Sequence, residues 1–289
     1  MRHNLHLQIG PASFRIGSAW AAPIRALSAL YQDYPQAELP CDFTVRLEPQ
    51  KPWRRWIRPS VGISGDYVLP GAAPLPLEHG LLAAEMGMNL QMALGQKRFL
   101  LLHAATVERG GRALVMTGES GAGKSTLAAL LGESGWRLLG DEFALLDPDT
   151  GLLHPFPRSV SLKNGAIAVL EGKVAADRFG PLLTGTPKGH IRHLRPNREA
   201  IERSREPARP ALILFPRFGA DLPEALRGVG AAEAFVRLTQ ASTNYGHLGL
   251  RGFEALTRLV TQTEARAIDY HQTATALRLV EALWAEDAA

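Results

Sequence analysis

The stretch ALVMTGESGAGKSTLAALLGESGWRLLGDE, residues 113–142, contains the pattern that decides the fold. Its centre, GESGAGKS from Gly118 to Ser125, satisfies the pattern G-x-x-x-x-G-K-[ST]. The apolar run Ala113–Thr117 before this centre predicts a strand, and TLAALLGE after it predicts a helix. A strand, a glycine-rich loop and a helix in this order are typical of the phosphate-binding loop of α/β proteins.

The loop has the residue types that a nucleoside triphosphate with Mg²⁺ requires. Its glycines let backbone N–H groups approach phosphate oxygens without obstruction by a Cβ atom, and the helix that follows adds the positive end of its dipole. Lys124 is the expected charge for the β- and γ-phosphates, and the Ser125 hydroxyl is the expected Mg²⁺ ligand. We therefore expect ATP and Mg²⁺ as cofactors, with the nucleotide bound by Gly118, Glu119, Ser120, Gly121, Ala122, Gly123, Lys124, Ser125 and Thr126.

A pair of acidic residues follows the predicted helix after room for one return strand. Trp136–Leu139 has the apolar character of such a strand, and Asp141 and Glu142 come shortly after it. In a parallel α/β sheet, an acidic residue just past a strand end lies beside the phosphate loop. A triphosphate site also needs a carboxylate to position Mg²⁺ or to take a proton. Both residues are candidates for these roles, with helix capping or a solvated turn as the alternative.

Composition narrows the remaining classes of function. The chain has 289 residues, of which 46% are hydrophobic and 21% charged, as in globular proteins with a sizeable core. Cys41 is the single cysteine, which excludes an intrachain disulfide and a thiolate metal cluster. We find no apolar run of the length of a secretion signal or a bilayer span, so we expect a cytoplasmic protein without a membrane partner.

The formal net charge of +4 is concentrated in one tract. Lys188–Arg209 carries seven Lys or Arg and three Glu, a surplus equal to that of the whole chain. Such a tract either neutralises phosphates or an acidic partner, or forms a solvated face of salt bridges between interleaved charges. The sequence leaves both interpretations open. Nucleic acid is not an expected partner, because no recognition motif accompanies the charge.

Outside the loop, the sequence predicts a β-rich N-terminal region over 1–76, a connecting helix over 77–98 and an α/β domain over 99–289. In the first region, strands are expected at Leu5–Ile9, Phe43–Leu47 and Tyr67–Leu69, and a helix at Pro23–Tyr31. The elements expected in the α/β domain are two hairpins over 99–117 and 143–156, strands at 136–139, 211–215 and 267–270, and helices at 124–133, 231–240, 253–262 and 273–284.

The run LLLHAATVERGGRALVMTGESGAGKSTLAALLGESGWRLLGDE, residues 100–142, resembles the catalytic core of HPr kinase/phosphorylase. In that family a strand containing LHA, a hairpin and a phosphate loop precede a short helix and two acidic residues. Over most of its length, the chain is similar to a bacterial subgroup described as HPr-kinase-related kinases of type A. The motifs that carry this similarity are HPFPRSVSLKN (154–164), TGTPKGHIRHLRP (184–196), ARPALILFPRF (208–218) and NYGHLG (244–249).

The resemblance implies a P-loop kinase domain of the HPr-kinase/PEP-carboxykinase type and assigns roles to three residues. Asp141 matches the general base that acts on the acceptor serine. His103 matches the histidine that contacts this aspartate, although by itself a histidine in an apolar strand is more often a core residue. Glu142 stands where the family has a second aspartate that is associated with Mg²⁺.

The chain departs from the family downstream of this core. The family has an Arg-Gly signature where this chain has SLKN, residues 161–164, so we expect neither phosphorylase activity nor HPr as the substrate. Lys163 and Lys188 are the candidates for neutralising phosphate charge in place of that signature. Hexamers are common in the parent family, so the resemblance admits a homo-oligomer, although no feature of the sequence establishes one.

The expected activity is ATP-dependent transfer of the γ-phosphoryl group to a Ser or Thr hydroxyl of an unidentified peptide or protein. The catalytic candidates are Asp141, His103 and Lys124, and the metal-ligand candidates are Ser125 and Glu142. Two alternatives remain open, namely a small-molecule kinase on the same fold and a nucleotide-sensing binding module without significant transfer.

Overall fold

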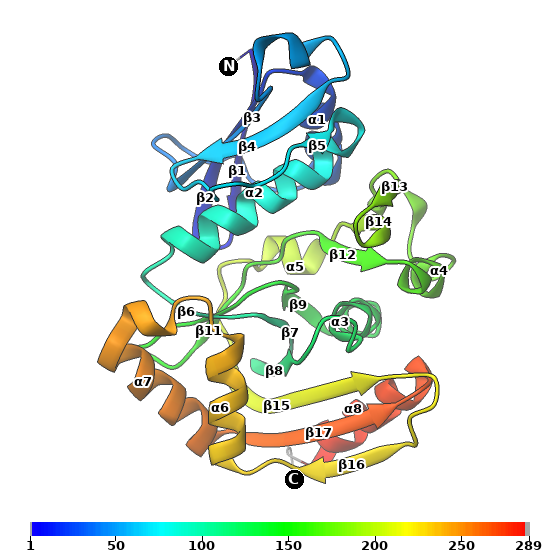
Figure 1. Cartoon of the computed structure of the whole chain (residues 1–289). Coiled ribbons are helices and arrows are strands. Elements are labelled where there is room, and N and C mark those ends of the chain that lie inside the picture. Colours follow the sequence, from blue (N-terminus) through cyan, green and yellow to red (C-terminus); the bar gives the residue numbers. More distant parts are fainter. Residues whose placement is uncertain (1, 287–289) are drawn as a thin grey trace. The chain divides into compact units, whose positions relative to one another are not determined.

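The computed structural model describes residues 2–286, which divide into two compact units. Unit 1 contains the chain up to Gln96 together with Ser161–Ala168 and Ala175–Arg195, and unit 2 contains the rest. The predicted regions 1–76, 77–98 and 99–289 follow chain order, whereas two segments of the last region belong to unit 1. Both units contain strands and helices (Figure 1), so the predicted mixed α/β class is confirmed.

Unit 1 contains a five-stranded sheet of order β1-β2-β3-β4-β5 and a three-stranded sheet of order β12-β14-β13. The strands are β1 (His3–Ile9), β2 (Ala12–Ser18), β3 (Phe43–Glu48), β4 (Ser60–Gly65), β5 (Leu75–Pro76), β12 (Val160–Lys163), β13 (Leu183–Thr186) and β14 (Gly189–Leu194). The first residue of β12, Val160, belongs to unit 2. The helical segments are α1 (Ala21–Leu30), η1 (Pro52–Arg55), η2 (Leu77–His79), α2 (Gly80–Gly95), η3 (Ala176–Arg178) and α4 (Gly165–Leu170), the last of which contributes residues to both units.

Two helices pack on the larger sheet of unit 1. β2 and β3 are parallel, and α1 makes the crossover that a parallel pair requires. A Cβ atom on Gly87 would lie 2.5 Å from Cγ1 of Val45, so the glycine allows α2 to approach β3 closely. The predicted helix at Pro23–Tyr31 and the predicted strands at Leu5–Ile9 and Phe43–Leu47 are confirmed.

The strand predicted at Tyr67–Leu69 is wrong, because this segment is irregular. The side chain of Gln91 in α2 binds both polar backbone groups of Tyr67, accepting from its N–H at 2.9 Å and donating to its carbonyl oxygen at 2.9 Å. A side-chain amide thus takes the place of the partner strand that the β-type sequence suggested.

Unit 2 contains a six-stranded sheet of order β16-β17-β15-β8-β7-β9 and a three-stranded sheet of order β11-β10-β6. The strands are β6 (Leu100–Leu102), β7 (Ala104–Arg109), β8 (Arg112–Thr117), β9 (Arg137–Gly140), β10 (Ala144–Leu146), β11 (Leu153–His154), β15 (Arg209–Phe218), β16 (Ala225–Gly228) and β17 (Glu264–Tyr270). The helices are α3 (Lys124–Gly132), α5 (Arg198–Glu202), α6 (Ala231–Ala241), α7 (Tyr245–Gln262) and α8 (Thr273–Glu286).

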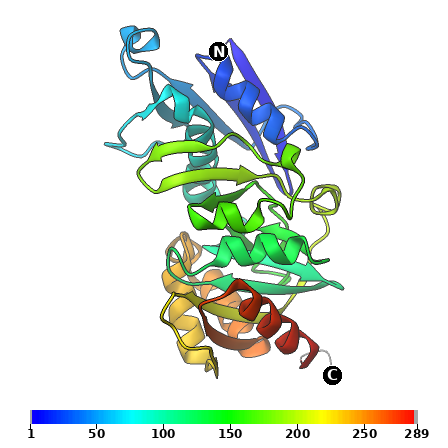
Figure 2. The ribbon, with the colours of Figure 1, turned by 90° about the vertical axis from the view of Figure 1, so that its right-hand side faces the viewer.

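Helices cover both faces of the six-stranded sheet (Figure 2). α3 and α8 pack against each other on one face, whereas α6 and α7 pack on the other. The core on the α6 and α7 side joins Leu238 and Leu256 from these helices to Val115 and Ile213 from neighbouring strands. Of the predicted elements, both hairpins, the three strands and the four helices are confirmed, with α7 extending beyond its prediction through a break at Gly249.

Strand direction places three sequence-distant segments at one edge of this sheet. β7 is antiparallel to both β8 and β9, so β8 and β9 run in the same direction. The carboxyl ends of β8 and β9 therefore lie at the same end of the strands as the start of β7. We call this border of the sheet, formed by strand ends and not by an outermost strand, the loop edge. The residues at this edge are His103 before β7, Gly118 after β8 and Asp141 after β9. The sheet is mixed rather than fully parallel, yet it brings the predicted loop and acidic pair to the same edge.

In residues 2–286, no helix combines the length and the apolar character needed to cross a membrane.

Candidate functional site

The predicted phosphate loop leads directly into α3, which begins at Lys124. Gly121 and Gly123 have φ angles of 88° and 89°, in the left-handed region that glycine adopts most readily. A Cβ atom on Gly123 would overlap the hydroxyl of Tyr270, so no larger side chain fits here without movement. The loop conformation therefore requires glycine at this position for reasons of both backbone angle and space.

Tyr270, at the end of β17, supports the loop from the α3 side of the sheet. Its hydroxyl donates a hydrogen bond to the carbonyl oxygen of Ala122 at 3.2 Å. Burial raises the pKa of this hydroxyl to about 12, so it remains a protonated donor at neutral pH. The ring of Phe218 packs against that of Tyr270, with centroids 5.5 Å apart. Two strand ends thus hold the turn that precedes α3.

Lys124 lies under the loop with only 7% of its surface exposed. Its Nζ atom donates to the carbonyl oxygens of Gly118 at 2.7 Å and Glu119 at 2.9 Å. Ser125 and Thr126 follow in the first turn of α3 and are partly exposed. A buried ammonium group, a glycine turn without Cβ atoms and a helix N-terminus together fit a phosphate group.

At the same edge, His103 connects the loop to the acidic pair. Its carbonyl oxygen accepts a hydrogen bond from Oγ1 of Thr117 at 3.0 Å, directly before the loop. Its Nε2 atom lies 3.5 Å from Oε2 of Glu142, and both side chains are partly exposed. His103 is therefore an exposed residue of the site edge, not a core histidine.

The two acidic residues differ in environment. Asp141 is buried, with 5% of its surface exposed, whereas the Glu142 side chain is 39% exposed and forms the ion pair with His103. The ring of His103 forms an ion pair with Glu142, and the contact with Asp141 that the resemblance implied stays a prediction.

Residues 2–286 contain no cluster of three or more His, Cys, Asp or Glu side chains suited to a metal ion. Mg²⁺ is usually held by one or two carboxylates together with substrate phosphates, so the donor set of Ser125 and Glu142 is compatible with it.

The two lysines predicted to neutralise phosphate both belong to unit 1. Lys163 ends β12, and Lys188 lies in the turn between β13 and β14. The Asn164 side chain joins these segments, donating to the carbonyl oxygen of Lys188 at 3.2 Å. The structure brings the two lysines into one part of unit 1, and their role toward the phosphate loop stays a prediction.

The later part of the basic tract forms salt bridges within itself. Arg198 pairs with Glu202, and Arg203 pairs with Glu199 and Glu206. This part of Lys188–Arg209 therefore has the ion pairs that a solvated face would have, and a role toward phosphates or an acidic partner stays a prediction.

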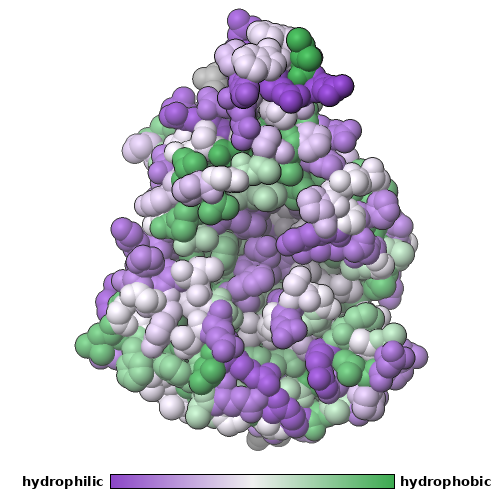
Figure 3. Space-filling model, in the orientation of Figure 1, coloured by the Kyte–Doolittle hydropathy of each residue, from purple (hydrophilic) through white to green (hydrophobic). Residues whose placement is uncertain are grey.

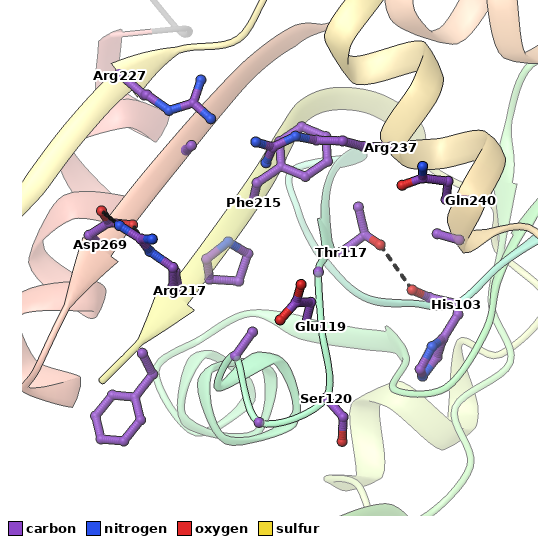
Figure 4. A pocket seen from close by; sticks show the side chains of 17 residues that line it. His103, Thr117, Glu119, Ser120, Phe215, Arg217, Arg227, Arg237, Gln240 and Asp269 are labelled. Carbon is purple, nitrogen blue, oxygen red and sulfur yellow. Dashed lines mark hydrogen bonds and ion pairs between the residues drawn. The ribbon is translucent and has the colours of Figure 1, made fainter. Parts of the chain in front are cut away.

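A cleft of about 880 Å³ opens beside the phosphate loop (Figure 4). Its lining includes His103, Thr117 and the loop residues 118–122. The other lining residues were not predicted as site residues and come from β15, β16, α6 and β17. They are Phe215, Pro216, Arg217, Phe218, Arg227, Arg237, Gln240, Ala241, Ala267 and Asp269.

Only part of this lining had a signal in the sequence. Phe215 and Arg217 lie in ARPALILFPRF, one of the motifs that carry the resemblance, at the end of an apolar strand. Arg227 and Arg237 have no such marker, and only the pairing of β16 with β17 and the packing of α6 bring them to the cleft.

No protein-family model matches the chain, and a search of curated proteins found no match either. The function must therefore be inferred from the site itself.

Proposed function

We propose that the chain is an ATP-dependent kinase that transfers the γ-phosphoryl group to a Ser or Thr hydroxyl of a peptide or protein. The observation that carries the proposal is the phosphate loop with a buried Lys124 and with Asp141 at the same sheet edge. In this proposal unit 2 is a P-loop kinase domain of the HPr-kinase/PEP-carboxykinase type. We further propose a cytoplasmic location, because the reaction consumes ATP.

ATP with Mg²⁺ would supply the phosphoryl group, and the loop residues would hold its phosphates through their backbone N–H groups. Lys124 neutralises negative charge on the phosphates from its place under the loop, where its Nζ atom donates to two loop carbonyl oxygens. Ser125 and Glu142 are the candidate protein ligands of the metal ion. Phosphoryl transfer depends mainly on positioning and on charge neutralisation, which these groups provide.

Asp141 has the role of general base in this proposal. Its carboxylate takes the proton of the acceptor hydroxyl as the oxygen forms its bond to phosphorus and the bond to the leaving ADP breaks. His103 orients the neighbouring Glu142 through the ion pair at 3.5 Å. Thr117 in turn fixes the backbone of His103 by its hydrogen bond.

The test uses the full chain, γ-labelled ATP with Mg²⁺, and lysate fractions above and below peptide size. Label in the large fraction supports the proposal, whereas label only in the small fraction indicates a small-molecule kinase. ATP binding without transfer to either fraction indicates a nucleotide-sensing module. Calorimetric titration of Lys124→Ala with Mg·ATP is the companion measurement, and unchanged affinity in a folded variant would contradict the loop assignment.

A further inference from the structure

We propose that the part of the cleft formed by Arg217, Arg227 and Arg237 is a second anion subsite. It binds a carboxylate or phosphate group of the phosphoryl acceptor, and its assignment to the acceptor rests on the proposed kinase function. We call these three residues the arginine group.

The arginine group comes from three different elements that face one cleft. Arg217 lies in β15, Arg227 in β16 and Arg237 in α6. The strand register puts Arg217 opposite Asp269 and Arg227 opposite Ala267, and both of these partners also line the cleft. Figure 3 shows hydrophilic side chains gathered over α6 and the strands beside it. Three cationic side chains thus converge on a concave surface next to the phosphate loop.

Carboxylates hold the arginine group in position. Asp269 Oδ1 accepts from Nε of Arg217 at 2.9 Å, and Oδ2 accepts from Nη2 of the same residue. Glu233 accepts from Arg227 at 2.9 and 3.3 Å and pairs with Nη2 of Arg237 at 2.6 Å. The guanidinium of Arg237 also lies over the ring of Phe215, 4.8 Å from its centroid (Figure 4).

These ion pairs leave N–H donors of the arginine side chains for a further ligand. A guanidinium has five N–H donors, and Asp269 engages two of those on Arg217. The three side chains are 65%, 51% and 37% exposed for Arg217, Arg227 and Arg237, respectively. Three arginines line the cleft together with the carboxylates of Asp269 and Glu119, so the lining itself carries one positive charge in excess. Glu233 lies outside the lining and pairs with Arg227 and Arg237 from there. A cleft lined by an excess of one sign raises the local concentration of the opposite charge.

The chemistry of the arginine group defines the ligand. The planar fork of a guanidinium matches the two oxygens of a carboxylate or phosphate, as the pair with Asp269 already demonstrates. The side-chain amide of Gln240 adds a neutral donor and acceptor to the same lining. The ligand is therefore an acceptor with an anionic group close to its hydroxyl.

The position of the cleft favours the acceptor over the nucleotide. The lining contains loop residues 118–122 but not Lys124, Ser125 or Thr126, which begin α3. It also contains His103, the partner of Glu142 at the edge where Asp141 lies. The cleft thus includes one residue of the sheet edge that carries Asp141, the proposed general base.

The first test measures anion binding without phosphoryl transfer. Inorganic pyrophosphate and citrate are titrated calorimetrically into the full chain carrying Lys124→Ala, which removes the charge of the phosphate loop. Lys124→Met is the second background if the alanine variant does not fold. We expect saturable binding that weakens about tenfold with added Arg217→Gln or Arg227→Gln, the loss expected for a charge-assisted hydrogen bond. Added Glu233→Gln should tighten binding, because it removes a competing carboxylate.

Arg251→Gln is the matched control. Arg251 is 52% exposed and pairs with Asp149 at 2.7 Å, but it does not line the cleft. Its substitution should leave anion binding unchanged. The proposal is overturned if the parent background shows no saturable binding, if the two cleft arginine variants bind like the control, or if Glu233→Gln weakens binding.

The second test identifies the source of the anion in the parent chain. A serine peptide flanked by glutamates is compared with its glutamine counterpart for labelled transfer, with citrate as competitor. Preference for the acidic peptide, reduced by Arg227→Gln, supports an acidic peptide acceptor. Equal use of both peptides, with anion binding retained in the first test, assigns the subsite to a small carboxylate or phosphate acceptor. Anion binding without any transfer contradicts the kinase proposal and leaves the subsite standing.

Discussion

The six-stranded sheet of unit 2 has arginine–carboxylate pairs at both of its edges, and their environments are opposite. At the edge away from the loop, Arg137 Nε lies 2.5 Å from Glu108 Oε2, and both side chains are 2% exposed. At the loop edge, the side chains of Arg217 and Asp269 are 65% and 22% exposed. The same chemical pair is structural where it is buried and available to a ligand where it faces a cleft.

The buried pair meets the conditions that make a buried charge tolerable. Arg137 Nη1 also donates to the carbonyl oxygens of Arg203 at 2.7 Å and Glu206 at 3.0 Å. Glu108 accepts from the backbone N–H of Gly111 at 2.5 Å, in the turn between β7 and β8. These bonds tie β7, β9 and the segment after α5 together. The network therefore links these segments at the edge opposite the site, and removing one partner would leave a buried charge unpaired.

The largest expected effect is on chemistry at the loop edge. Asp141→Asn should retain Mg·ATP but lower turnover by about 10² to 10⁴, because an amide cannot accept the acceptor's proton. Calorimetry and single-turnover transfer, measured on the same preparation, check this. Joint loss of nucleotide binding and transfer would make Asp141 a metal ligand instead of the base.

At the opposite edge the expected effect is on stability. Arg137→Met should lower the free energy of unfolding by about 3–5 kcal/mol, because it removes the nearer partner charge of the buried Glu108 and leaves only Arg203 at 3.9 Å. Arg217→Gln is the matched variant at the loop edge and should leave the free energy of unfolding nearly unchanged, because the Arg217 side chain is exposed. Urea unfolding of both variants is the measurement. Similar losses in the two would abolish the distinction between the edges.

Gly123→Ala should have an intermediate effect that reaches both stability and binding. An alanine here must adopt the left-handed φ angle of Gly123, which costs about 1–3 kcal/mol. Its Cβ atom would also overlap the Tyr270 hydroxyl. Adding Tyr270→Phe removes the overlap but not the backbone strain, so it should recover only part of the loss. Thermal unfolding without Mg·ATP measures the loss of stability, and the shift on adding Mg·ATP measures the loss of binding. Full recovery of both in the double variant would show that backbone strain is unimportant.

The pH dependence of the free energy of unfolding should report on the buried pair at the edge away from the loop. Burial would raise the pKa of Glu108, but the hydrogen bonds from Arg137 and Gly111 hold it below its ordinary value of 4.5. The stabilisation from Glu108 is therefore fully present above pH 4.5 and is lost as the pH falls through the lower pKa of the folded state. Chemical unfolding between pH 6 and pH 3 should show a shallower decline in Arg137→Met than in the parent.

The smallest effect is expected for an ion pair with no role at either edge. Arg198 and Glu202 pair on α5, with side chains 86% and 57% exposed. Arg198→Ala should change the free energy of unfolding by no more than about 0.5 kcal/mol and leave transfer unaffected. A larger change in the free energy of unfolding, or any change in transfer, would mean that the basic tract is more than a solvated surface.

The phosphate loop is the part of the predicted site that is contiguous along the chain. The loop, its flanking strand and α3 are encoded in residues 113–132, so local pattern was sufficient. The arginine group is assembled from β15, β16 and α6, whose register and packing no local pattern specifies. For the same reason, the sequence did not indicate that Ser161–Ala168 and Ala175–Arg195 join unit 1. The strand predicted at Tyr67–Leu69 failed because a distant Gln91 binds its backbone.

The hydrogen bond from Tyr270 to Ala122 joins residues 148 positions apart. During synthesis the ribosome releases the phosphate loop long before it adds β17, so the loop first exists without its support. A nascent chain that has not yet reached Tyr270 should therefore bind nucleotide poorly, and competence should appear abruptly when the last strand docks. If the proposed function holds, nucleotide binding would therefore report that synthesis has passed β17.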